Sequence, residues 1–366
     1  MSPAQALDLL VPGDPARRTG GSLYDARIAD GLRAAGWTVR VHGLHGDYPV
    51  ADGTARRALD HALASVPDGG RAVIDGLALG GLPEVAETHA ARIELIALIH
   101  HPLCDETGLD WALARRLLGH ERRAVAACRR IITTSRFTAK RLRELAIGSA
   151  PVTVVEPGTD PAALARGALG DPGVDEPVQL LSVGSLVPRK GQDLLIDALI
   201  RLGDSSDTPA DSERIGRGWT CRLIGAPRDP EFADRLRARI AGAGLGARIL
   251  LAGEADADAL DRAYREADLF VLPSRYEGYG MVVTEALARG LPIVSTTGGA
   301  LAETVPDDAG LKVAPNDAGA LADALERWFG DAGLRERLAA GARRARGELL
   351  DWPGAAERFG RAVSRR

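Results

Sequence analysis

The sequence predicts an α/β protein built from two doubly wound domains in tandem. Short apolar runs alternate with stretches of helical periodicity through both halves of the chain, which is the pattern of a parallel sheet covered by helices on both faces. The length of 366 residues suits two domains of ordinary size. A stretch rich in turn-forming residues, ALGDPGVDEP, separates the two series and is the expected linker.

The first half begins with a predicted strand in ALDLLVPG and, after the loop DPARRTGG, a predicted helix in SLYDARIADGLRAAG. The apolar residues of this helix recur at helical spacing, and Gly36 ends it. Helical stretches separate the strands that follow, so the predicted sheet is parallel. These further strands are expected in WTVRVHGL, RAVIDGLA, IELIALIH, RRIITTS and PVTVV.

The second half repeats this alternation. Its strands are expected in VQLLSVGSL, TCRLIGA, ARILLAGE, DLFVLPS, LPIVSTT and GLKVA. The polar segment 203–218 is predicted to be a surface loop. The expected domains are therefore residues 1–165 and 176–350, and residues 351–366 are expected to form a helix that crosses back to the first domain.

Composition and charge exclude several classes of protein. Apolar residues make up 45% of the chain and charged residues 26%, which indicates a globular protein. The formal charge of −4 argues against a nucleic-acid binder. The apolar stretch Leu95–Ile99, with five residues, is far shorter than the roughly 20 that a membrane span needs. The N-terminus has no signal-peptide pattern, and the three cysteines form no CxxC pair, so we expect a reducing, cytoplasmic compartment.

One segment departs from the overall charge. Between Trp111 and Leu145, ten Arg or Lys residues stand against two Glu residues. The arginine pairs 115/116, 122/123 and 129/130 recur every seven residues, which predicts one helical stripe from Arg115 to Arg130. Two interpretations remain open: a solvated helix face, or peripheral contact with anionic lipid at the inner membrane face or with a phosphorylated acceptor.

Ligands of open parallel sheets bind beyond the carboxyl ends of the strands, and one such loop, PSRYEGYGMVVTEAL, follows the apolar run DLFVL. Glu277 and Glu285 can accept hydrogen bonds from sugar or ribose hydroxyls, and free amides at the helix start can face a phosphate. The alternative is a helix start with acidic residues that the macrodipole favours. The other residues expected at this loop are Gly278, Tyr279, Gly280, Met281 and Val282.

Three other loops carry candidate residues. In LLSVGSLVPRKG, Arg189 and Lys190 precede a helix, where the dipole disfavours cations, so an anionic partner such as a diphosphate is indicated. The structural alternative is a solvated pair. The pair Gly20-Gly21 permits close backbone approach to a ligand, although such a pair is often only a turn. His100, followed by His101, stands at the end of an apolar strand, where it is either a proton carrier or a packed side chain.

In their order, these segments resemble the retaining nucleotide-sugar glycosyltransferases of family 4, which have the GT-B fold. The resemblance covers nearly the whole chain, and its most specific part is the last of its motifs. The motifs are GGS, IHHP, TTSRFTAKRL, VVEPGTD, SVGSLVPRKG and EGYGMVVTEALARGLPIVSTTGGALAE. It implies two Rossmann-like domains that face each other across a cleft, the first binding the acceptor and the second the nucleotide sugar.

The resemblance also implies roles for single residues. Glu285 would hold the ribose hydroxyls and Glu277 the hydroxyls of the donor sugar. Lys190, with an arginine, would hold the diphosphate, which Gly21 would approach from the other domain. His100 would contact the donor sugar near the reacting carbon.

One departure from the family pattern concerns the diphosphate. The family often has Gly-Arg where this chain has Gly184-Ser185, so Arg189 or Arg275 is expected to replace the missing arginine near Ser185. His100 is preferred over His101 because the family histidine directly follows the strand.

The expected activity is transfer of a sugar from a nucleotide-diphosphate donor to a hydroxyl acceptor, which is a glycan, a lipid-linked molecule or a small molecule. The resemblance implies retention of configuration. No DxD-type pair appears where a metal would be needed, so we expect no metal and no cofactor. The alternatives are a GT-B epimerase or hydrolase and a non-catalytic sugar-nucleotide-binding protein. A dinucleotide-dependent oxidoreductase is disfavoured because no G-x-G-x-x-G opens a helix after either first strand.

Overall fold

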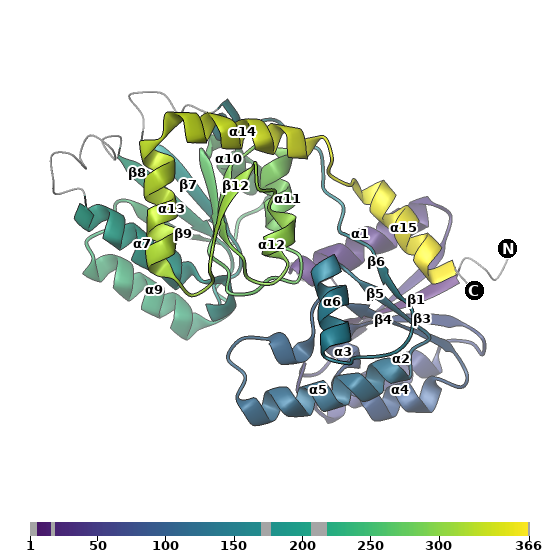
Figure 1. The fold of residues 1–366 in the computed structure, drawn as a ribbon. Helices are drawn as coiled ribbons and strands as arrows, with labels where there is room; N and C mark the ends of the chain where they lie inside the picture. Colours follow the sequence, from purple (N-terminus) through teal and green to yellow (C-terminus); the bar gives the residue numbers. More distant parts are fainter. Residues whose placement is uncertain (1–5, 16–18, 170–176, 206–217, 365–366) are drawn as a thin grey trace. The chain divides into compact units, whose positions relative to one another are not determined.

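A computed structural model describes residues 6–15, 19–169, 177–205 and 218–364. The chain forms two compact units (Figure 1). Unit 1 comprises residues 1–158 and 350–366, and unit 2 comprises residues 159–349. Most of the expected linker and most of the expected loop at 203–218 lie outside the described residues.

Unit 1 contains a six-stranded sheet in the order β2-β1-β3-β4-β5-β6, and every neighbouring pair is parallel. The central strand β4 is apolar and fully buried from Leu95 to Ile99, as expected for a strand covered on both faces. The strands are β1 (Ala6–Pro12), β2 (Thr38–Leu44), β3 (Arg71–Asp75), β4 (Glu94–Ile99), β5 (Arg130–Thr133) and β6 (Val152–Val154).

Several helices of unit 1 begin where short polar side chains satisfy free backbone amides. Asp52, Asp110 and Ser135, for example, cap the second, fifth and sixth helices. The elements are α1 (Gly20–Ala34), α2 (Gly53–Ala64), α3 (Gly76–Leu79), α4 (Pro83–His89), the 3₁₀ turn η2 (Leu103–Asp105), α5 (Trp111–Ala126), α6 (Arg136–Glu144) and α15 (Trp352–Ser364).

Unit 2 contains a second six-stranded sheet, in the order β12-β11-β10-β7-β8-β9, and its neighbours are also parallel. Its strands are β7 (Val178–Val183), β8 (Trp219–Ile224), β9 (Ile249–Gly253), β10 (Leu269–Leu272), β11 (Ile293–Thr296) and β12 (Gly310–Val313). The two parallel sheets confirm the predicted α/β class.

Helices cover the sheet of unit 2 with two apolar clusters, one of which includes Trp219 and Trp328 and the other Tyr264 and Phe270. The elements are η3 (Arg166–Leu169), η4 (Pro188–Lys190), α7 (Gln192–Ser205), α9 (Pro230–Gly242), α10 (Ala257–Glu266), α11 (Met281–Ala288), α12 (Leu301–Thr304), α13 (Ala318–Gly330) and α14 (Ala332–Arg346).

The C-terminal helix α15 packs against α1 within unit 1 (Figure 1). Gly31 of α1 faces Ala356 of α15 so closely that a Cβ atom at position 31 would lie 2.4 Å from the Ala356 Cβ. The rings of Trp352 and Phe359 lie 6.3 and 6.5 Å from the ring of Tyr24. Part of the core of unit 1 is therefore supplied by the end of the chain.

The predicted arginine stripe from Arg115 to Arg130 is wrong in its last part. Helix α5 ends at Ala126, and Arg130 belongs to strand β5, where it pairs with Glu94 at 2.7 Å. Within the helix, Arg123 is already paired with Glu84 and Glu87. The seven-residue period therefore spans a helix and a strand and does not define one face.

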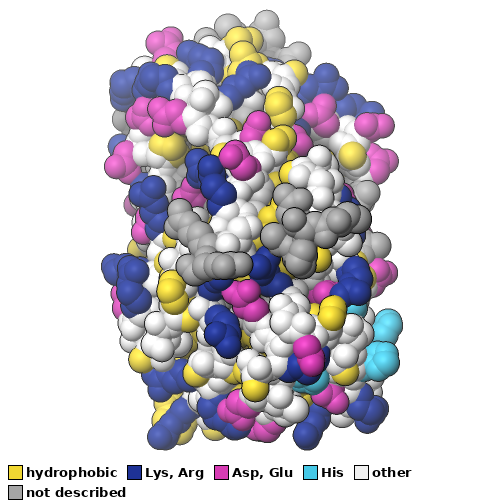
Figure 2. All heavy atoms as spheres, turned by 90° about the vertical axis from the view of Figure 1, so that its right-hand side faces the viewer, with side chains coloured by type: hydrophobic (Ala, Val, Ile, Leu, Met, Phe, Trp, Pro, Cys, Tyr) yellow, Lys and Arg dark blue, Asp and Glu magenta, His cyan; other side chains and the backbone are white. Residues whose placement is uncertain are grey.

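The surface and the helices add two observations about membranes. On the face shown in Figure 2, Lys and Arg side chains are interspersed with Asp and Glu, so that face presents no extended basic field. Within the described ranges, no helix is long and apolar enough to cross a bilayer.

The contact between Gly31 and Ala356 predicts a stability effect. We expect Gly31→Ala to lower the urea-unfolding midpoint, because overpacking costs about 1–3 kcal/mol and outweighs the gain of up to ~1 kcal/mol in helix propensity. Gly119→Ala, in α5, is the control: nothing lies within 4 Å of the added Cβ, so this variant should be as stable as the wild type or more stable. Equal midpoints for the two variants would contradict the packing described for α1 and α15.

Candidate functional site

The strand order of each unit contains one switch point, where connections run in opposite directions from neighbouring strands. In unit 2 this point lies between β7 and β10, and in unit 1 between β1 and β3. Loops that follow the carboxyl ends of these strands diverge there and leave room for a ligand. The residues singled out in unit 2 lie on or beside these loops, Gly20 and Gly21 follow β1, and His100 and His101 follow the neighbouring strand β4.

In unit 2, a buried carboxylate joins the loops that follow β7 and β10. Lys190 Nζ lies 2.6 Å from Glu277 Oε1, and Arg189 Nη1 lies 3.4 Å from Glu277 Oε2. Ser274 Oγ donates to Glu277 Oε1 at 2.6 Å. The loops approach closely because Gly191 has a φ of +66° and no side chain: a Cβ atom there would lie 2.1 Å from the Pro273 carbonyl oxygen.

The charges of this cluster act on one another at short range. The Glu277 side chain is 6% exposed, and burial alone would raise its pKa, but Lys190 and Arg189 lower the pKa below its ordinary value of 4.5. Two cations thus lie beside this carboxylate at the amino-terminal side of α7, where a helix dipole favours an anion.

Two further predicted residues of unit 2 are held within this loop system. The Arg275 guanidinium makes a bidentate pair with Asp193, at 2.8 and 2.7 Å, and also donates to Asn316 Oδ1 at 2.7 Å. The carbonyl of Ser185 accepts a hydrogen bond from Gln192 Nε2 at 3.0 Å.

The segment from Gly278 to Glu285 forms a second polar surface. Helix α11 begins at Met281, directly after Gly280, whose φ is +92°. As at the start of any helix, the amides of its first residues, Met281 and Val282, have no acceptor within the helix. Glu285 is partly exposed on the second turn and accepts a hydrogen bond from the Tyr264 hydroxyl at 2.8 Å. Burial raises the pKa of Glu285 above its ordinary value of 4.5.

In unit 1, His100 directly follows β4 and lies among residues from three other segments. Its Nε2 is 3.4 Å from both Asp25 Oδ1 and Asp75 Oδ2. Its carbonyl oxygen accepts a hydrogen bond from Thr138 Oγ1 at 3.1 Å. A Cβ atom at Gly21 would lie 3.5 Å from the imidazole, so the backbone of α1 passes directly over the ring.

These two aspartates are functional candidates that the sequence analysis missed. Asp25 is 3% exposed and Asp75 is 5% exposed, and neither has the apolar side chain that burial favours. Burial alone would lower the pKa of His100, but the two carboxylates raise it to about 10. The carboxyl end of the predicted strand RAVID could have indicated Asp75, whereas nothing in the helical pattern distinguishes Asp25.

The same three side chains are the group of the described chain that could hold a metal ion. One ligand atom from each of Asp25, Asp75 and His100 lies within 4.8 Å of the other two. Two carboxylates with one neutral imidazole would suit a divalent cation, and with one imidazolium they suit a proton instead.

The remaining predicted residues of unit 1 lie outside this triad. His101 Nε2 is 3.4 Å from Glu106 Oε2, a separate pair on the loop after β4. Gly20 is exposed at the start of α1, and a Cβ atom there would meet nothing within 4 Å.

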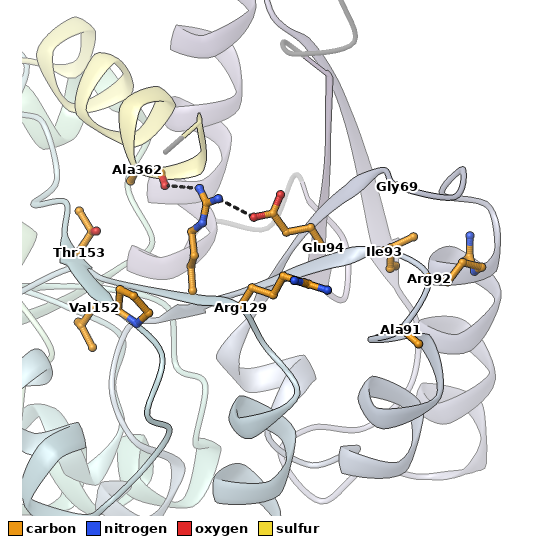
Figure 3. A pocket seen from close by; sticks show the side chains of 11 residues that line it. Gly69, Ala91, Arg92, Ile93, Glu94, Arg129, Val152, Thr153 and Ala362 are labelled. Carbon is orange, nitrogen blue, oxygen red and sulfur yellow. Dashed lines mark hydrogen bonds and ion pairs between the residues drawn. The ribbon is translucent and has the colours of Figure 1, made fainter. Parts of the chain in front are cut away.

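A hollow of about 900 Å³ lies in unit 1, at the edge where strands β4 and β5 begin (Figure 3). Arg130 forms an ion pair with Glu94 and donates a hydrogen bond to the Ala362 carbonyl. Dashed lines mark both interactions in Figure 3. His100 follows the opposite, carboxyl end of β4, so the hollow is not part of the candidate site.

Comparisons with known proteins bear on both units. Residues 172–345 match the family model "Glycosyl transferases group 1", and residues 81–163 match "Glycosyltransferase Family 4". The lipopolysaccharide core biosynthesis mannosyltransferase LpsB of Rhizobium meliloti is 36% identical over 43% of this chain and 42% of its own length. A D-inositol 3-phosphate glycosyltransferase of Acidothermus cellulolyticus is 34% identical over 62% of this chain and 51% of its own length. The chain thus spans about half the length of these curated relatives.

Solved structures are similar over the whole chain. The sucrose-phosphate synthase of Thermosynechococcus elongatus has a TM-score of 0.76 at 22% identity and covers 98% of both chains. Anabaena HepE in complex with UDP-glucose has a TM-score of 0.71 at 18% identity and covers 98% of this chain and 99% of its own. At such identities the likeness establishes the fold.

The opposite pKa shifts of Glu277 and Glu285 predict opposite effects of pH on stability. The lowered pKa of Glu277 stabilises the fold above pH 4.5, and this contribution is lost as the pH falls through the folded-state pKa. The raised pKa of Glu285 instead costs stability as the pH rises above 4.5. We therefore expect Glu277→Gln to be less stable than the wild type at pH 7, by about 2 kcal/mol, and the gap to narrow below pH 4.5.

Glu285→Gln is the matched control, and its stability relative to the wild type should improve as the pH rises above 4.5. Urea unfolding of the three proteins between pH 3 and pH 8 measures both trends. Parallel pH profiles for the two variants would contradict the charge assignments.

Proposed function

The chain belongs to the family 4-like glycosyltransferases with the GT-B fold, and on that premise we propose that it transfers a sugar from a nucleotide-diphosphate donor to a hydroxyl acceptor. The observation that carries the proposal is the cluster of Lys190, Arg189 and Glu277 at the switch point of unit 2. Breaking a sugar–diphosphate bond leaves negative charge on the departing diphosphate. Two cations held in advance at that place stabilise the charge as it develops.

The acidic residues of unit 2 complete the donor site. Glu285 presents a partly exposed carboxylate near the first turn of α11, and we propose that it accepts hydrogen bonds from the ribose hydroxyls. Glu277 is proposed to accept hydrogen bonds from the sugar, and the amides of Met281 and Val282 to face a phosphate. The complexes of Anabaena HepE with UDP and with UDP-glucose support a nucleotide-sugar donor for this fold.

The finer features of the reaction are also proposals. The resemblance to family 4 supports retention of configuration in transfer of a hexosyl group. Lys190 and Arg189 supply the positive charge that a metal ion supplies at other diphosphate sites, which supports metal-independent transfer without a cofactor. A reducing, cytoplasmic compartment stays a proposal; the thiols of Cys104, Cys128 and Cys221 are free.

A donor panel tests this function. UDP-, GDP-, ADP- and dTDP-sugars are incubated with the full chain, with and without mixed hydroxyl acceptors, and nucleotide release is measured. We expect one nucleotide class to raise the melting temperature and to be released only when an acceptor is present. Release without an acceptor would indicate a hydrolase or epimerase, and binding without release in any mixture would indicate a non-catalytic binding protein.

Glu285→Ala is expected to weaken donor affinity about ten- to a hundredfold, because hydrogen bonds to a charged group contribute roughly 1.5–3 kcal/mol. Isothermal titration calorimetry with the donor found in the panel measures the change. Glu266→Gln, an exposed residue of the same unit paired with Arg222, is the control and should bind as the wild type does. Unchanged affinity of Glu285→Ala would remove Glu285 from the donor site.

A further inference from the structure

The Tyr264 side chain carries a hydroxyl that its packing does not require. Tyr264 lies on α10, is 1% exposed and belongs to the same apolar cluster as Phe270. The two rings are stacked, with 5.8 Å between their centroids. A phenylalanine would fill the same space, and a buried hydroxyl costs free energy unless it forms a hydrogen bond. The reason for a tyrosine at this position therefore lies in the partner of its hydroxyl.

That partner is the carboxylate of Glu285. The Tyr264 hydroxyl donates to Glu285 Oε2 at 2.8 Å, while the Val282 carbonyl oxygen is farther away, at 3.5 Å. Burial raises the pKa of Tyr264, so the hydroxyl keeps its single proton at neutral pH. Glu285 Oε1 accepts no hydrogen bond from any described residue. One carboxylate oxygen is thus held by the protein, and the other is left for a ligand.

Arg289 fixes both members of this pair. Its guanidinium lies over the Tyr264 ring, 4.5 Å from the centroid. Nη1 donates to the Glu285 carbonyl oxygen at 2.9 Å, and Nη2 donates to Asp261 Oδ1 at 2.8 Å. Asp261 belongs to α10 and Arg289 directly follows α11, so one side chain joins the two helices. The tyrosine and the glutamate are therefore held in place in the absence of a ligand.

We propose that Tyr264 is a positioning residue of the donor site, which orients the Glu285 carboxylate toward the ribose and so selects ribonucleotide over deoxyribonucleotide donors. The inference rests on the proposed function, in which Glu285 accepts hydrogen bonds from the ribose hydroxyls. A glutamate on a helix surface has several rotamers, and ordering it on binding costs conformational entropy. Because the Tyr264 hydroxyl orders the carboxylate in the folded protein, this cost does not fall on the binding step.

The consequence is a substrate class. A mobile carboxylate can turn to water when a ligand offers it no hydroxyl, whereas a carboxylate held in place stays without a partner, which costs affinity. A nucleotide that lacks one of the ribose hydroxyls is therefore rejected. The donor is a ribonucleoside-diphosphate sugar, and donors built on dTDP belong to the disfavoured class.

Nucleotide binding to the full chain tests the inference. The probes are UDP, GDP and ADP with their 2′-deoxy and 3′-deoxy counterparts, and isothermal titration calorimetry measures each Kd. The ribose selectivity is the Kd of a deoxy form divided by the Kd of the ribonucleotide. For the base that binds most tightly, we expect at least one of the two selectivities of the wild type to be about tenfold or more.

Tyr264→Phe removes one oxygen atom and keeps the ring, and its melting temperature shows that it is folded. We expect this variant to bind the ribonucleotide about three- to tenfold more weakly, and its ribose selectivity to fall to about threefold or less. In the Glu285→Ala background the same change should alter affinity by less than about twofold, because no carboxylate is left to orient. A hydroxyl that only supports packing would weaken ribonucleotide and deoxy forms by the same factor.

Tyr48→Phe is the matched control. It removes the hydroxyl of a tyrosine of unit 1, which lies 3.5 Å from the His45 carbonyl oxygen, and should leave every affinity and selectivity unchanged. Wild-type selectivity in Tyr264→Phe would overturn the proposal. Equal affinities of the wild type for the ribonucleotide and both deoxy forms would overturn it as well.

The failure of this inference can be told apart from the failure of the proposed function. Binding with the expected selectivities, but without transfer to any acceptor, would refute the proposed function and leave the positioning role of Tyr264 standing. Transfer with a selectivity that Tyr264→Phe does not change would refute the positioning role alone. Binding of none of the nucleotides would refute both.

Discussion

The ion pair between Lys190 and Glu277, with 2.6 Å between Nζ and Oε1, is the interaction on which the site of unit 2 depends. It joins the loops after β7 and β10, and these loops approach closely because Gly191 lacks a side chain that would strike the Pro273 carbonyl. Removing the Glu277 carboxylate costs about 2 kcal/mol, because the charges of Lys190 and Arg189 lose their hydrogen-bonded partner. The requirement for charge compensation therefore fixes the loop geometry before any ligand arrives.

The two units combine cations and buried carboxylates in different proportions. In unit 2, Lys190 and Arg189 both lie beside the Glu277 carboxylate, which fits the proposed diphosphate site. In unit 1, one imidazole faces the two buried carboxylates of Asp25 and Asp75. The diphosphate is therefore proposed to bind beside the cations of unit 2 and not beside the carboxylates of unit 1.

The sequence predicts the strands well because each is a short apolar run that ends in turn-forming residues, as in DLFVLPS before Glu277. It also predicts that Lys190 lies beside a helix start. It does not show that Asp25 approaches His100, since that contact depends on the order of strands in the sheet, which periodicity does not encode. The predicted arginine stripe from Arg115 to Arg130 is wrong in its last part because no glycine or proline marks the end of α5 at Ala126. The seven-residue spacing of the arginine pairs therefore continues into strand β5.

An arginine is common in the family at the position of Ser185. The two residues that could replace it, Arg189 and Arg275, differ in the partners that they already have. Arg275 would have to leave a bidentate pair with Asp193 to reach a phosphate, and so would exchange one charged partner for another with little gain. Arg189 donates to the Tyr276 carbonyl at 2.9 Å and stands 3.4 Å from Glu277, so it already lies beside the Lys190–Glu277 pair. A diphosphate bound beside Lys190 would meet the Arg189 guanidinium with the Arg275–Asp193 pair left intact. We therefore propose that Arg189, and not Arg275, takes the role that the family often gives to the arginine at this loop.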